Sequence, residues 1–172
     1  MEIEPFLLGV AGSLVASIVF LIFASFFRPQ LSISKTISKG EYDGKNIYSV
    51  KVVNCGCRTA INIRAEMQII GNRVVEGGKG RKIYDVKLLK NDRCILKPYC
   101  KNNPLDCSFE FSTDANLEVE WSNTQESTLL LRVIAQDSFT SFSKVYEQEY
   151  FSIKEAIING RFAIGKKMII HR

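Results

Sequence analysis

Histidine is nearly absent from this sequence: His171 is the only one among 172 residues. Serine and cysteine nucleophiles need a neighbouring general base, which is most often a histidine, and no G-x-S-x-G motif is present to supply the nucleophile. Glu118 and Glu120 alternate with apolar residues, which favours a solvated face over a pair of catalytic acids. We therefore expect no enzymatic activity, no catalytic residue and no cofactor.

The cysteines lack both the spacing of a zinc site and the even number of a disulfide framework. Five are present, and the spacings C-x-C, C-x5-C and C-x6-C include no C-x2-C pair. Because these spacings do not suit zinc, we expect no metal site. Reduced thiols are typical of cytoplasmic proteins, so we expect the domain to lie in the cytoplasm. The five residues are Cys55, Cys57, Cys94, Cys100 and Cys107.

Charge is missing altogether from segment 6–27, which is rich in Leu, Ile, Val and Phe. As a helix this segment is long enough to cross a hydrocarbon core of about 30 Å, and each of these residues favours insertion by about 0.3 to 0.6 kcal/mol. We predict a transmembrane helix over residues 6–27. The alternatives are a helix buried in a soluble core, which would keep a polar stripe, and a cleaved signal peptide, which would have a basic start and a cleavage site.

Lysine and arginine are also missing before Arg28, although the chain carries 23 of them. Basic residues follow the predicted span closely, whereas the segment before it carries only acidic ones. Because basic residues favour the cytoplasmic side, we predict that residues 1–5 form a short external head and residues 28–172 a cytoplasmic domain. The basic residues nearest the span are Arg28, Lys35, Lys39 and Lys45.

Small residues recur along one face of the predicted helix, and we call this face the small-residue stripe. In lipid, helices associate through close packing of small residues and through hydroxyl hydrogen bonds. We therefore predict a homo-oligomer packed through the stripe. In its sharpest form, the hypothesis is a pore lined by the stripe, with Phe20 placed to plug the constriction. The stripe consists of Gly9, Gly12, Ser13, Ala16, Ser17 and Ala24.

Residues 28–172 show the period-two alternation of strands, interrupted by turn residues. Turns are expected at 41–45, which would close a hairpin, and at 54–58. Segment 114–122 suits a helical turn, and 153–159 suits either a strand or a short helix. The predicted fold class is an all-β, immunoglobulin-like sandwich of seven to nine strands behind one N-terminal transmembrane helix. Its strands are expected at 30–38, 46–54, 59–70, 82–89, 93–96, 107–112, 128–135, 142–150 and 162–170, with 128–135 at the centre.

The glycine-rich segment 71–81 is predicted to be a loop, and residues 76–82 are the one stretch of the sequence that could hold an anionic ligand. Its glycines allow backbone N–H groups to converge on a phosphate, and Lys79, Arg81 and Lys82 add positive charge. The net charge of +5 favours a nucleotide or an oligonucleotide as that ligand. The G-x4-G-K-[ST] spacing of a Walker loop is absent, so a plain hairpin tip is the alternative. Three aromatic residues would either stack a base or fill the core: Trp121, Tyr146 and Tyr150.

The C-terminal part of the chain carries an ordered set of segments: Asp137-Ser138-Phe139, then KVYEQEY at 144–150, then 153–160 followed by Phe162. This arrangement resembles the last part of the immunoglobulin-like cytoplasmic domain of inward-rectifier potassium channels. The paired segments 49–54 and 60–69 resemble strands of the same domain. The resemblance implies the fold of that domain. It does not imply potassium selectivity, because the sequence has no second span, pore helix or TVGYG loop.

The layout as a whole is similar to uncharacterised bacterial single-span proteins and to membrane effectors of bacterial anti-phage systems, such as the Hailong type. This similarity implies a bacterial inner-membrane protein of antiviral defence with a protein partner encoded nearby. We therefore expect a membrane-anchored, oligomeric, ligand-responsive effector that forms a pore or ion channel in the lipid bilayer. The alternative is a membrane-tethered protein-binding or structural module without a pore.

Overall fold

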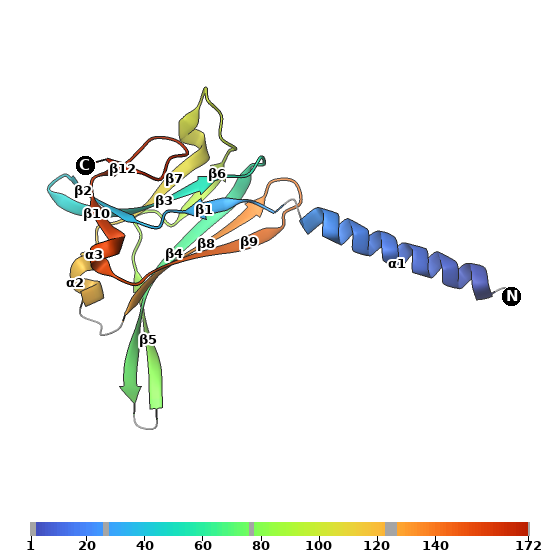
Figure 1. Ribbon diagram of the computed structural model, residues 1–172, viewed down its shortest axis with the longest axis horizontal. Coiled ribbons are helices and arrows are strands. Elements are labelled where there is room, and N and C mark those ends of the chain that lie inside the picture. The colour runs from blue at the N-terminus through green and yellow to red at the C-terminus, as the bar shows by residue number, and fades with distance from the viewer. Residues whose placement is uncertain (1–2, 26–27, 76–77, 123–126, 172) are drawn as a thin grey trace.

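The computed structural model describes residues 3–25, 28–75, 78–122 and 127–171. One long helix, α1 (Ile3–Ser25), precedes a domain built mostly of strands. Figure 1 shows α1 extending away from that domain. The structure thus confirms an N-terminal apolar helix followed by a β-rich domain.

Within the described ranges, α1 is the one helix that is long and apolar enough to cross a membrane, over Leu7–Ala24. The side chains of residues 7–23 are exposed in the single chain. The core of the β domain therefore does not bury this helix, as the soluble-core alternative would require. The same length and composition also fit a signal sequence near the N-terminus.

The first sheet is organised around its longest strand, β3, which pairs with β1 and β2 along one edge and with β7 along the other. The predicted hairpin is confirmed as β2–β3. Asp43 and Gly44 at its turn have φ angles of 52° and 72°, which a tight hairpin turn requires. The strands are β1 (Leu31–Ile33), β2 (Ile37–Tyr42), β3 (Lys45–Asn54), β7 (Ser108–Thr113) and β10 (Ile157–Asn159).

The second sheet has the order β5-β4-β8-β9, with β6 also paired to β4. The most apolar strand, β8, lies in its interior, as the sequence predicted for 128–135. A short third pair, β11 with β12, follows at the C-terminal end. The strands are β4 (Ala60–Val75), β5 (Gly78–Val86), β6 (Asp92–Leu96), β8 (Thr128–Asp137), β9 (Ser143–Tyr150), β11 (Arg161–Phe162) and β12 (Ile170–His171).

The described residues form twelve strands, more than the seven to nine predicted. The predicted strand 30–38 is divided into β1 and β2, since the buried Ser34 hydroxyl donates to the Thr36 carbonyl at 2.7 Å and interrupts the extended run. The predicted last strand, 162–170, is likewise replaced by two short strands and a connecting loop. One pair, β2 with β10, is parallel, and the immunoglobulin-like topology stays a prediction.

The predicted loop 71–81 is wrong, because most of it belongs to a hairpin. Beyond Ile70, which pairs with Thr128 of β8, strand β4 continues with β5 as its partner from Gly71 to Val75. We call this two-stranded extension (residues 71–75 and 78–82) the β-arm, and Figure 1 shows it projecting below the body of the domain. The glycine content of this segment is typical of a loop. The β4–β5 hydrogen-bond ladder, which begins inside the second sheet, nevertheless extends through these glycines.

Three short helices complete the domain. In α2 (Leu117–Ser122), Leu117 and Trp121 are four residues apart and both buried, which gives the predicted helical turn one apolar face. Segment 153–159 contains both predicted alternatives, since α3 (Ile153–Ala156) leads directly into β10. A 3-10 helix, η1 (Pro104–Cys107), lies at the end of the predicted loop 97–106.

One apolar core lies between the two sheets and includes Trp121 and Tyr150. Trp121 Nε1 donates to the Ser127 carbonyl at 2.9 Å, and the Tyr150 hydroxyl donates to the Ser34 carbonyl at 2.6 Å. These two aromatic residues are therefore core residues with satisfied polar groups, not a platform for a base. Burying a large apolar side chain of this kind stabilises the fold by about 1.5–3 kcal/mol.

Candidate functional site

Pro29 and Gln30 are the residues at which the chain enters the β domain after α1, and we call them the junction. The hydroxyl of Tyr146, on β9, donates to the Pro29 carbonyl, and Pro29 is buried. The Gln30 carbonyl accepts hydrogen bonds from the backbone N–H groups of Cys55 and Gly56, at 2.7 and 3.2 Å. Strand β1 begins immediately afterwards at Leu31. The backbone of the junction is thus fixed by both sheets.

The turn at 54–58, which receives the junction, is itself braced by a buried asparagine. Asn54 Nδ2 donates to the carbonyls of Arg58 and Leu96 at 2.7 and 2.9 Å, and its Oδ1 accepts from the Gly56 N–H at 3.0 Å. A Cβ added at Gly56 would lie 3.2 Å from the Cβ of Gln30, which is tighter than nearly all real contacts. The close approach of the turn to the junction therefore favours glycine at this position.

Sequence reasoning identified only part of this junction. The proline ring at position 29 fixes its own backbone, and this restriction can be read from the sequence. Tyr146 was noted as an aromatic residue but not as a partner of Pro29, and Asn54 was seen only as a turn residue. Pairings of this kind depend on which distant strands become neighbours, and no local pattern signals them.

The small-residue stripe lies open on α1. A Cβ added at Gly9 or Gly12 would meet no atom within 4 Å. The hydroxyls of Ser13 and Ser17 donate to the carbonyls of Val10 and Ser13, both at 2.8 Å, so neither is left unsatisfied in an apolar medium. Within the stripe, Ala16 is exposed, whereas Ala24 is only 4% exposed and so differs from what a pore lining suggests. Phe20, the predicted plug, is 66% exposed.

The predicted basic ligand site lies on the β-arm, and its side chains do not converge. Arg81 and Lys82 are exposed and adjacent on β5, so they point to opposite faces of the ribbon. Lys82 Nζ lies 4.6 Å from the centroid of the Tyr84 ring, whereas the side chain of Lys79 lies outside the described residues. Backbone groups that a phosphate cradle would use belong instead to the β4–β5 ladder. The arm is therefore a basic ribbon, not a phosphate loop.

A groove that sequence reasoning missed lies on the outer face of the first sheet. It has a volume of about 370 Å³, with serine hydroxyls on its floor and larger side chains around them. In the groove, the Ser49 and Ser112 hydroxyl oxygens are 2.8 Å apart. The Arg161 guanidinium, which also lines the groove, donates to the Glu41 carbonyl at 3.5 Å. These residues alternate with core residues on their strands and form no local motif. The groove is lined by Ser38, Tyr42, Ile47, Ser49, Leu89, Glu110, Ser112, Arg161 and Phe162, among others.

A buried lysine lies close to this groove. Lys51 on β3 is 1% exposed, and its ammonium donates to the carbonyls of Ala163 and Lys167 in the C-terminal segment, the latter at 3.0 Å. Burial lowers the pKa of Lys51 and raises the pKa of Glu110, which is opposite Lys51 on β7. The contacts of Lys51 are those of a residue that fastens the C-terminal segment to the sheet, so we assign it a structural role.

No group of three or more potential metal ligands occurs in the part of the chain that the structure describes. All five cysteines are free thiols, and four of them are exposed. The buried one, Cys107, donates to the Pro104 carbonyl at 3.2 Å, and burial raises the pKa of its thiol. A raised pKa reduces the thiolate fraction, so this cysteine is poorly suited to act as a nucleophile.

Comparison with known proteins identifies no family. No family model and no curated protein matches the chain. Among solved structures, a protein assigned as ApaA from Bordetella pertussis is 12% identical and has a TM-score of 0.39. The match spans 71% of this chain and 91% of the ApaA chain. A FixG-related protein from Vibrio parahaemolyticus is 11% identical, covers 73% of this chain and 96% of its own, and has a TM-score of 0.26. At these values neither likeness indicates a function, and the similarity to potassium-channel domains stays a prediction.

Proposed function

We propose that this protein is a single-span, membrane-anchored, oligomeric effector whose β domain converts ligand binding into movement of its helix. The observation that carries the proposal is the junction. Pro29 and Gln30 are bonded to β9 and to the turn at 54–58, so a rotation of the domain would reach the helix instead of being absorbed by a flexible linker.

Two features support the membrane part of the proposal. The side chains of residues 7–23 are exposed and apolar, a surface that a lipid bilayer or neighbouring helices would cover. Basic residues follow α1, and none precedes it in this sequence. This bias favours a cytoplasmic β domain at a bacterial inner membrane, with residues 1–5 on the other side.

The pore is the sharper form of the proposal. Several copies of α1 would meet along the small-residue stripe, where Gly9 and Gly12 present no side chain to keep backbones apart. The passage between them would be narrow and apolar, and such constrictions open and close by wetting. The exposed ring of Phe20 would lie in it. Depolarisation by such a pore would suit an effector of antiviral defence.

The ligand proposed for the β domain is an anionic nucleotide or oligonucleotide. The β-arm supports this class through its positive charge, with Arg81 and Lys82 exposed on its two faces. Because the arm is a ribbon, it would contact successive phosphates of an extended ligand more readily than enclose one phosphate. A ligand moves the helix only if it binds two states unequally, and a preference of about 100-fold supplies about 2.7 kcal/mol per subunit.

A protein-binding module without a pore is the second candidate, and one observation favours it. The exposed apolar side chains at the base of the β-arm, Ile83 at 57% and Tyr84 at 40%, would suit a protein partner better than a nucleotide. In that case the partner would be encoded nearby, and α1 would only anchor the complex.

The test of the proposed function is to loosen the junction. A Gly-Ser-Gly-Ser insertion between Arg28 and Pro29 leaves helix and domain unchanged but uncouples them. Membrane depolarisation and growth are measured in bacteria that express the protein, with and without phage challenge. We expect wild type to depolarise cells on challenge and the insertion variant to fail.

The matched control places the same insertion between Asp43 and Gly44, in the exposed β2–β3 turn. This control should behave as wild type. Equal depolarisation by both insertion variants contradicts the coupling role of the junction. If wild type depolarises cells under neither condition, the pore is wrong, and the module without a pore takes its place.

A further inference from the structure

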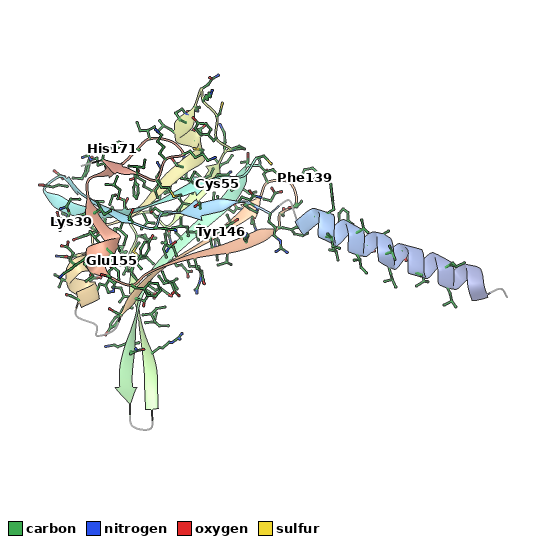
Figure 2. The ribbon with its side chains drawn as sticks, in the orientation of Figure 1. Lys39, Cys55, Phe139, Tyr146, Glu155 and His171 are labelled. Atoms are coloured by element: carbon green, nitrogen blue, oxygen red, sulfur yellow. The ribbon has the colours of Figure 1, made fainter. Side chains whose placement is uncertain are left out.

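One exposed aromatic residue lies beside the point where α1 meets the β domain. Phe139 is 82% exposed and belongs to the β8–β9 turn (residues 138–142). Figure 2 shows Phe139 at the end of the domain from which α1 extends, with Tyr146 and Cys55 on the same side. Phe142, in the same turn, is 37% exposed. Exposed apolar side chains are common on protein surfaces, so what distinguishes this pair is its place at the end of the domain from which α1 extends.

The turn is held in a fixed shape by a fully buried carboxylate. Asp137 Oδ1 accepts hydrogen bonds from the backbone N–H groups of Phe139 and Thr140, at 3.0 and 2.8 Å, and from the Thr140 hydroxyl at 3.0 Å. Its other oxygen lies 3.1 Å from Arg58 Nε, and the Arg58 guanidinium lies 5.1 Å from the centroid of the Phe139 ring. The phenylalanine is thus presented rigidly, with a cation beside its ring.

The position of the turn relative to the helix follows from the register of β9. Tyr146, which donates to the Pro29 carbonyl, is three residues along β9 from Ser143, where the strand begins. At about 3.3 Å per residue, the start of β9 extends roughly 10 Å beyond Tyr146 toward the turn. The turn therefore lies past Pro29, on the side of the domain from which Figure 1 shows α1 extending.

We infer that the β8–β9 turn is a second membrane contact, in which Phe139 enters the interfacial layer of the lipid bilayer. This inference rests on the proposed function insofar as it takes α1 to be in the membrane. Phenylalanine is among the apolar side chains that surface-bound segments bury in this layer, and basic residues there are attracted by anionic lipid headgroups. The exposed cations near the turn are Arg28 on the chain that leaves the helix and Lys144 at the start of β9. Two attachment points, the helix and the turn, would fix the tilt of the domain against the bilayer.

The experiment places a tryptophan at the turn in the full-length protein, reconstituted in vesicles of phosphatidylcholine and phosphatidylglycerol whose acyl chains are brominated. Phe139→Trp is compared with Tyr42→Trp, a similarly exposed position at 73% at the end of β2, which Figure 1 shows at the opposite side of the domain. The native Trp121 is buried, and its signal is subtracted using wild type. Ile18→Trp, on the exposed face of α1 away from the small-residue stripe, reports whether α1 is in the bilayer.

We expect brominated lipid to quench Phe139→Trp several-fold more than Tyr42→Trp, and Ile18→Trp more than either. Quenching of Ile18→Trp without quenching of Phe139→Trp overturns the second contact and leaves the anchor intact. Equal quenching at positions 139 and 42 also overturns it, because the lipid would then be reached without regard to the turn. No quenching at position 18 overturns the proposed anchor and, with it, this inference.

Discussion

At the scale of single residues, two buried charges affect stability in opposite directions. Burial by itself would raise the pKa of Asp137, but the hydrogen bonds from Thr140 and Phe139, together with Arg58, lower it overall. The fold therefore favours the ionised carboxylate. Burial lowers the pKa of Lys51, and Glu110 offsets this only in part, so the fold disfavours the charged ammonium.

Replacing Asp137 by asparagine removes the ion pair with Arg58 and weakens the bonds that shape the β8–β9 turn. We expect Asp137→Asn to lower the free energy of unfolding by about 1–3 kcal/mol at neutral pH, measured by urea unfolding in detergent. A carboxyl with a lowered pKa stabilises the fold above its unfolded value of about 3.9 and loses that contribution as the pH falls through the folded value. The difference between variant and wild type should therefore shrink in acid. Asp43→Asn, in an exposed turn with φ 52°, should change little.

Lys51 predicts a pH dependence on the alkaline side. The unfolded chain keeps the lysine proton up to a pKa of about 10.4, whereas the folded chain releases it at lower pH, so stability rises with pH through that window. We expect wild type to show this rise and Lys51→Met to lack it, measured as the free energy of unfolding between about pH 8 and 10. Lys45→Met, at an exposed position, is the control and should keep the rise. An identical slope in all three proteins contradicts the role assigned to burial.

At the scale of elements, local patterns predicted what local chemistry determines. Alternation and turn residues identified the β2–β3 hairpin, the position of β8 and the helical turn at α2. The β-arm was predicted as a loop, with a hairpin tip as the alternative that the structure supports, because glycines and charges resemble a loop until the β4–β5 ladder is known. The outer groove was missed because Ser49, Glu110 and Arg161 come from three strands whose pairing no short window contains.

The helix α1 allows a direct test of self-association through the small-residue stripe. We expect Gly12→Ile to abolish oligomers of the detergent-solubilised protein, measured by cross-linking and light scattering, because the larger side chain separates the backbones. Within one chain a Cβ at Gly12 meets nothing within 4 Å, so any effect must arise between chains. Leu14→Ala, on the opposite side, should leave the oligomers intact. Equal effects of the two changes would show that the stripe has no packing role.

At the scale of the whole molecule, the positions of the cysteines report which side of the membrane the β domain occupies. Four thiols are exposed on that domain. Since the basic residues follow α1, we expect a membrane-impermeant maleimide to leave them unlabelled in intact cells and to label them after lysis. Glu4→Cys, at the other end of the helix, should be labelled without lysis. Labelling of wild-type protein in intact cells reverses the orientation and removes the case for a cytoplasmic ligand.

The parallel pairing of β2 with β10 has a consequence for how the protein is made. Ile37 pairs with Ile157, so the first sheet joins a segment synthesised early with one synthesised late. The Tyr146 contact with Pro29 likewise waits for β9. While the ribosome works, α1 can enter the bilayer long before its junction exists, and the early strands remain without their final partners beside the membrane. In the proposed membrane-anchored effector, a nascent chain would therefore be anchored first and coupled last, so that only completed molecules would transmit a signal.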